Sequence, residues 1–200
     1  MRKLIFFLGG IMLSGIISCS KSENPETENA QAIQSFQNLE KKTDQRMAFS
    51  LLTVNEKVEL AKEHIDFCIS YFNLTSTQVG ILENVKSNLK NMYSSTDPEN
   101  EPSSIKLALD IQQYFSSLTD LDGQIIFDSM VTDEGGVNEM IAHNPDKVTT
   151  CTCSSKSNWC SSSPYGPRIT CDKTACNEMT TWGCGTLWNY SCNGKCNIFG

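Results

Sequence analysis

The sequence predicts a mainly α-helical protein: a small helical bundle followed by a disulfide-rich C-terminal module of loops and a β-hairpin. Apolar residues recur every three or four positions between residues 31 and 130, which is the period of an α-helix. Eight of the ten cysteines lie in the last fifty of the 200 residues. The net charge of -7 is also uneven, because residues 19–150 carry -11 and residues 151–200 carry +2. An acidic helical part therefore precedes a mildly basic, cysteine-dense part.

The chain opens with the basic pair Arg2-Lys3, and fourteen uncharged, mostly apolar residues follow it. That run is shorter than the ~20 residues of a membrane-spanning helix, so residues 1–18 are predicted to be a signal peptide. The residues before Cys19 resemble the lipobox of bacterial lipoproteins, which implies a mature chain that begins at a lipidated Cys19. Ser20 in place of Asp favours the outer membrane as the destination. An ordinary secretory signal with an incidental cysteine is the alternative.

Residues 19–30 contain little that a core could bury, so a flexible tether is expected there. A helical domain is predicted over residues 31–130, and its first apolar stripe is interrupted by polar residues. Capping boxes at 53–56 and 75–78 each precede a regular helical pattern, which predicts an antiparallel helix pair. Residues 105–118 predict another helix, and Thr119 caps a last short one.

Residues 131–150 are predicted to form a linker, because Gly135-Gly136 and Asn144-Pro145 are typical of loops. The glycine pair also resembles the double-glycine site at which leaders of some exported antibacterial peptides are cut. A plain turn is the alternative interpretation of the pair.

The helical part contains no catalytic or metal-binding pattern, so neither enzyme activity nor a cofactor is expected. His64 lies among charged residues and is expected to be a surface histidine, whereas Cys68 lies on an apolar stripe and is expected to be a buried, inert thiol. Nucleic acid is not expected as a partner, since the pI is about 4.8 and the C-terminal bases are few and scattered.

Export would place the clustered cysteines in an oxidising space, where an even number at this density predicts four disulfides. The spacing leaves their pairing open. A zinc site is the alternative, although the gaps are irregular and both histidines lie outside the cluster. The predicted disulfide cysteines are Cys151, Cys153, Cys160, Cys171, Cys176, Cys184, Cys192 and Cys196.

Fifty residues bury little apolar surface, so cross-links are expected to hold residues 151–200 as a self-standing module. Asn193-Gly194 predicts a hairpin turn after a strand over residues 186–192. Aromatic residues with so little interior to hide them imply an exposed surface that meets a partner or a lipid interface. The candidate contacts are Trp159, Trp182, Trp188, Tyr190 and Lys195.

Five segments of the C-terminal region carry a family resemblance: Cys151-Thr152-Cys153-Ser154, Ser157-Asn158-Trp159-Cys160, Thr174-Ala175-Cys176, Gly183-Cys184-Gly185-Thr186-Leu187-Trp188 and Cys192-Asn193-Gly194. Their order, spacing and non-cysteine residues resemble the bacteriocin fulvocin C-related family. The resemblance implies an antibacterial peptide, stapled by disulfides, that is delivered as the C-terminal part of an anchored precursor. Cys196 and residues 164–168 depart from the pattern, so no pairing is transferred.

The sequence therefore leads us to expect an exported antibacterial protein, anchored to its own membrane through Cys19. Its C-terminal module would act on the membrane or an envelope receptor of competitor bacteria. The acidic helices would mask the module until a cut in the linker, for example near Lys147, releases it; display on the anchor is the other route. Two alternatives stay open: a surface lipoprotein with a cysteine-rich binding module and no killing activity, and an immunity or sensing protein.

Overall fold

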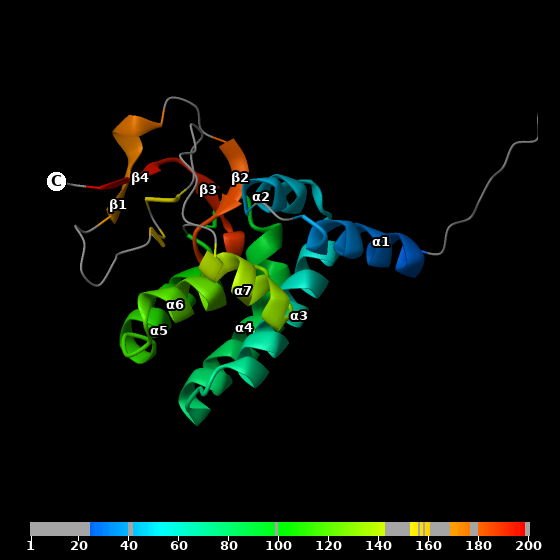
Figure 1. Cartoon of the computed structure of the whole chain (residues 1–200), viewed down its shortest axis with the longest axis horizontal. Helices are drawn as coiled ribbons and strands as arrows, with labels where there is room; N and C mark the ends of the chain where they lie inside the picture. Colours follow the sequence, from blue (N-terminus) through cyan, green and yellow to red (C-terminus); the bar gives the residue numbers. More distant parts are fainter. Residues whose placement is uncertain are drawn as a thin grey trace, which may run out of the picture.

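A computed structural model describes residues 25–39, 42–98, 100–142, 153–155, 157, 159–160, 169–176 and 180–198. Within this part the chain is mainly helical and ends in short strands (Figure 1), which confirms the predicted fold class. The helices are α1 Pro25–Gln37, α2 Lys42–Leu51, α3 Val54–Tyr71, α4 Ser76–Ser94, α5 Pro102–Tyr114, α6 Asp120–Phe127 and α7 Glu134–Ala142. The strands are β1 Ile169–Asp172, β2 Thr180–Cys184, β3 Tyr190–Cys192 and β4 Lys195–Ile198, with 3-10 turns η1 Lys173–Ala175 and η2 Thr186–Trp188.

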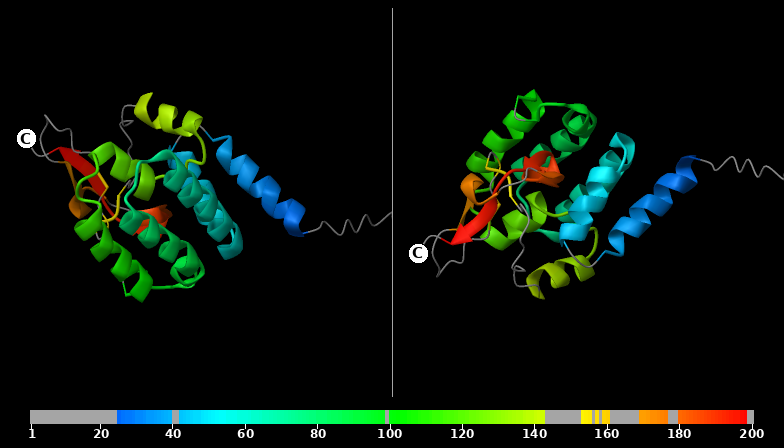
Figure 2. Two further views of the ribbon diagram at one scale, coloured as in Figure 1. Left: turned by 90° about the horizontal axis from the view of Figure 1, so that it is seen from below. Right: turned by 90° about the horizontal axis from the view of Figure 1, so that it is seen from above.

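Both predicted capping boxes are confirmed, and they start the two longest helices. The backbone N–H of Glu56 donates to Thr53 Oγ1, and the backbone N–H of Thr53 donates to Glu56 Oε2. Thr75 and Gln78 make the same exchange at the start of α4. Helices α3 and α4 lie side by side (Figure 2), as expected of a pair joined by a short turn.

Two segments predicted as irregular are helical, so those predictions are wrong for the residues concerned. Helix α1 begins at Pro25, inside the expected tether, and helix α7 occupies residues 134–142 of the expected linker. The Asp133 carboxylate accepts a hydrogen bond from Gly136 N at 2.8 Å, which satisfies a free N–H of the first turn. Val137 then packs against Ile125 and Val131, so tertiary burial holds a helix that its glycines disfavour.

The strands form two separate two-stranded antiparallel sheets, β1 with β4 and β2 with β3. The predicted hairpin turn at Asn193-Gly194 is therefore wrong, because this pair joins strands of different sheets. Gly194 instead bridges to Cys153, and a Cβ atom at position 194 would lie only 2.5 Å from Cys171 Sγ. The hairpin that does form joins β2 to β3, and residues 185–189 are its loop.

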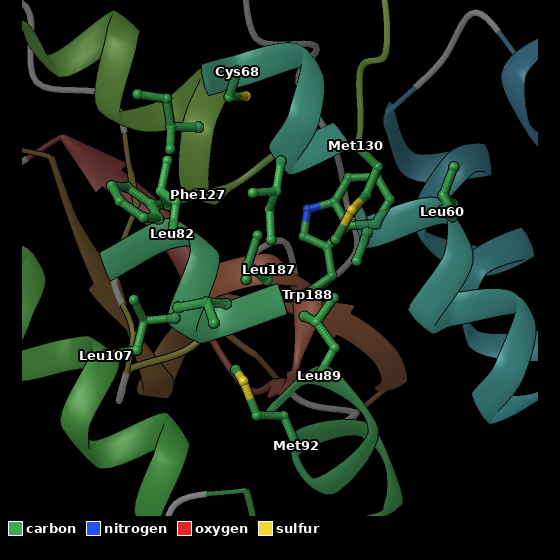
Figure 3. Close-up of a cluster of buried hydrophobic side chains, with 14 of the residues drawn as sticks. Leu60, Cys68, Leu82, Leu89, Met92, Leu107, Phe127, Met130, Leu187 and Trp188 are labelled. Atoms are coloured by element: carbon green, nitrogen blue, oxygen red, sulfur yellow. The ribbon is translucent and has the colours of Figure 1, made fainter. Parts of the chain in front are cut away.

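One apolar core extends from the helices into this hairpin loop. Leu187 and Trp188 belong to the same buried cluster as Leu60, Leu82 and Leu89. Figure 3 shows both side chains rising from the η2 ribbon into that cluster. The expectation of a self-standing C-terminal module is wrong, since the module and the helices share a core.

His64 on α3 is fully buried, which corrects its expected place on the surface. Its Nδ1 lies 2.6 Å from the Val131 carbonyl oxygen and its Nε2 lies 3.0 Å from the Ile126 carbonyl oxygen. Burial lowers the pKa of His64 despite these carbonyls, because water cannot solvate the charged ring. The neighbouring Cys68 is a free, buried thiol, as predicted, and burial raises its pKa to about 12.

A buried charge cluster fixes the segment that follows α6 against α2. Asp128 accepts from Arg46 at 2.8 Å and from Lys42 at 2.7 Å. The side chains of Arg46 and Asp128 are both buried, so each depends on the other for compensation of its charge.

We predict that Asp128→Asn lowers the free energy of unfolding by about 3 kcal/mol, because it leaves a buried guanidinium without its counter-charge. Urea unfolding at neutral pH measures the change. Lys62→Gln is the matched control, since it removes one partner of the exposed pair with Glu59 and should cost less than about 1 kcal/mol. Equal effects of the two substitutions would contradict the prediction.

We also predict that acid destabilises the protein through His64. Burial lowers the pKa of His64 in the folded state below the ~6.5 of the unfolded chain, so as the pH falls the unfolded chain binds this proton first. The free energy of unfolding should therefore fall as the pH drops from 7.5 to 5.5, at no more than about 1.4 kcal/mol per pH unit for one proton. His64→Gln should flatten this slope and His143→Gln should keep it; an unchanged slope in His64→Gln would refute the assignment.

Candidate functional site

The cysteine-rich region is cross-linked as predicted wherever the structure describes it. Disulfides join Cys153 to Cys171, Cys160 to Cys196 and Cys184 to Cys192, and Cys176 is also disulfide-bonded. All three of these bridges stay within the C-terminal region. Cys151 and the proposed lipidation site Cys19 lie outside the described residues.

Three of these sulfurs form a cluster, which bears on the zinc alternative. The Sγ atoms of Cys153, Cys160 and Cys171 lie within 4.8 Å of one another. Zinc binds thiolates, and the sulfurs here are already bonded in disulfides. A metal could occupy the cluster only after both bridges were reduced.

The loop between β2 and β3, residues 185–189, is the most unusual feature of the region, and we call it the buried turn. The Cys184–Cys192 disulfide closes it at its base. Gly185 has φ +69°, and two larger residues follow in the left-handed region, Leu187 with φ 51° and Trp188 with φ 53°. Each such non-glycine residue costs about 1–2 kcal/mol. The surrounding contacts must offset that strain.

Trp188 is 2% exposed and lies in an aromatic seat formed by α1 and α2. Its ring meets Phe36 edge-on at 6.0 Å between centroids and Phe49 at 5.4 Å. The Arg46 guanidinium lies 5.7 Å from the indole centroid, which is cation–π range. No hydrogen-bond acceptor among the described residues reaches the indole Nε1, although the atom is buried. The seat therefore offers good apolar packing and leaves one polar group unsatisfied.

Polar contacts attach the turn to two further helices. Tyr93 on α4 donates its hydroxyl to the Leu187 carbonyl at 2.9 Å, and burial raises the pKa of Tyr93, so the hydroxyl stays protonated. Asn189 donates its side-chain amide to Ser104 Oγ on α5 at 2.9 Å. Leu187 itself is fully buried. The buried turn is thus held by α1, α2, α4 and α5 together.

Trp159 also contacts the buried turn and connects it to α6. Its indole Nε1 donates to Thr186 Oγ1 at 3.0 Å, and its ring stacks on Phe127 with 5.2 Å between centroids. A Cβ atom at Gly123 would lie 3.1 Å from the ring, so a small residue suits this close approach. An open cavity of about 320 Å³ lies beside Trp159, between the end of α5 and the start of α6.

The predicted contact residues are mostly unavailable in the intact chain, which corrects the expected exposed aromatic surface. Trp188 and Tyr190 are buried, and Trp159 and Lys195 are half-buried. The Trp182 side chain lies outside the described part. Gly183 and Gly185, on either side of Cys184, are the sequence signal for the close approach and the positive φ found at this turn. Nothing in the sequence indicated that helices far away along the chain would cover its side chains.

No family model, curated protein or solved structure matches the chain. Among the described residues, no helix is both long enough and apolar enough to cross a bilayer.

We predict that Trp188→Ala destabilises the helices as well as the hairpin. Removing a buried indole should lower the free energy of unfolding by about 3 kcal/mol. Circular dichroism at 222 nm during urea unfolding reports the helices directly. Leu51→Ala, at a side chain that is 82% exposed, is the control and should change little. An unaltered helical transition in Trp188→Ala would mean that the two parts fold independently.

Proposed function

We propose that the chain is an exported antibacterial protein whose helices hold the C-terminal region in a latent state. Separation of the two parts would expose Leu187 and Trp188, and the freed region would act on the envelope of competitor bacteria. The observation that carries the proposal is the burial of these two side chains in the core of the helices. A region meant to contact a target directly would present such residues to solvent.

The pattern of cross-links supports separation. The three described bridges join cysteines within residues 153–198 and leave the helices unlinked. The described bridges would therefore not hold the two parts together after a single cut between residues 143 and 150, on the N-terminal side of Cys151. The bridges would also preserve the shape of the freed region, since they constrain its unfolded state.

The sequence supports export and the antibacterial role. The lipobox resemblance at Cys19 supports an anchor in the producer's own envelope, and the resemblance to the fulvocin C-related family supports killing. Opposite net charges, -11 before the cut and +2 after it, favour association until release. Anchoring on the producer would also keep the latent protein away from other cells.

The alternative is a surface lipoprotein that is never cut, whose cysteine-rich part binds a partner without killing. The shared core favours it, because parts that fold around one core behave as a unit. The half-buried Trp159 beside an open cavity would then be its candidate contact.

We predict that a cut between the two parts activates killing. Residues 20–200, purified in the oxidised form with a specific protease site placed within 143–150, should produce no inhibition zone on related bacteria. After cleavage and separation of the fragments, the C-terminal fragment should produce one. Protein without the engineered site, treated with the same protease, is the control.

Two results would count against the proposal. Inhibition of equal strength before and after cleavage would show that the uncut protein is not latent. No inhibition by either form, across a panel of related strains, would favour the uncut binding protein instead.

A further inference from the structure

We infer that the buried turn is a lipid-inserting tip, and that its aromatic seat in the helices is an autoinhibitory contact. The inference rests on the proposed function and specifies its target as a bilayer with anionic headgroups. Leu187 and Trp188 are the residues that would enter the lipid.

The first argument concerns what the turn can do once it leaves the helices. Among its described residues, the C-terminal region has no larger apolar core of its own to receive the turn: the separate cluster there consists of Cys184 and Cys192, with Cys176 beside them. The disulfide at the base of the turn keeps Leu187 and Trp188 together at the end of a closed loop. After release, both side chains would therefore stay exposed at one point.

The second argument concerns the seat, which is not a complete match for the turn. Leu187 and Trp188 both take left-handed backbone angles there, and the buried indole Nε1 meets no acceptor among the described residues. The boundary between lipid headgroups and acyl chains offers both an apolar environment for the ring and hydrogen-bond acceptors for the indole Nε1, namely water, carbonyl and phosphate oxygens. A lipid interface can satisfy the indole better than the seat does.

The third argument concerns size and charge. Two side chains cover far less than the ~800 Å² that each partner contributes to a standard protein interface, so a bilayer suits the tip better than a protein receptor. Lys173 is exposed and Lys195 half-buried, and the region carries +2 overall. Anionic lipid would attract this region and repel the helical part at -11.

The test compares four forms of oxidised residues 20–200 by flotation with vesicles of phosphatidylethanolamine and phosphatidylglycerol at 3:1. The forms are the parent, Phe49→Ala, Trp188→Ser and the double variant. Phe49→Ala removes part of the seat, so it should raise the vesicle-bound fraction about tenfold. Trp188→Ser also disrupts the seat but removes the tip, so it should leave binding at the parent level.

The double variant decides whether the tip or the opened helical core binds lipid. Binding at the parent level supports the tip. Binding as high as that of Phe49→Ala overturns it, because the exposed core would then be responsible. Phosphatidylcholine vesicles should bind the released C-terminal fragment several-fold less than the anionic vesicles do, and equal binding would overturn the anionic preference.

Killing and lipid binding are read out separately, so each proposal can fail alone. A cut protein that kills bacteria, but whose C-terminal fragment does not float with vesicles, would overturn the tip and indicate a protein receptor. A fragment that floats through Trp188 but does not kill would overturn the antibacterial function and support the tip.

Discussion

The packing of Trp188 against Phe36 and Phe49 is the contact on which the arrangement of the whole chain depends. The C-terminal region is too short to build an apolar core, and the helices alone would expose the aromatic rings of α1 and α2. The Trp188 indole covers the aromatic rings of the seat and attaches the cysteine-rich region to the helices. Without it, the C-terminal region would keep only the contacts that Leu187, Asn189 and Trp159 make with the helices, which is closer to the two separate parts that the sequence predicted.

That difference marks the limit of what local sequence could predict. Capping boxes at Thr53 and Thr75 predicted two helix starts, because their hydrogen bonds lie within four residues. The cysteines predicted cross-linking because their number and density are enough to indicate disulfides, without any knowledge of the fold. The seat joins Trp188 to rings about 140–150 residues away, and no local pattern carries such a contact. The place of His64 was wrongly predicted in the same way: it has charged neighbours in sequence, but its ring is buried against the carbonyls of Ile126 and Val131.

The disulfide at the base of the buried turn explains how a strained backbone can persist. Left-handed angles at two adjacent non-glycine residues survive only where the surroundings determine them strongly. The Cys184–Cys192 bridge fixes the ends of the turn, and Gly183 permits the approach, since a Cβ there would lie 2.4 Å from the Trp188 carbonyl oxygen. The hydrogen bond from Tyr93 and the packing of Leu187 fix its apex. The strained backbone is thus stabilised by the disulfide at its base and by the helices at its apex. Loss of the helices would leave only the disulfide.

Arg46 couples this seat to the charge cluster after α6. One guanidinium faces the Trp188 ring and also donates to Asp128, which Lys42 contacts as well. The Arg46 guanidinium is buried, so its charge requires compensation inside the protein, and Asp128 provides it. In the sequence, Asp128 lies between Ile126 and Val131, whose carbonyls face His64. Helix α3, the segment after α6 and the seat are therefore connected through residues 126–131. Any change that loosens Asp128 should therefore also loosen the turn, although the two lie on different elements.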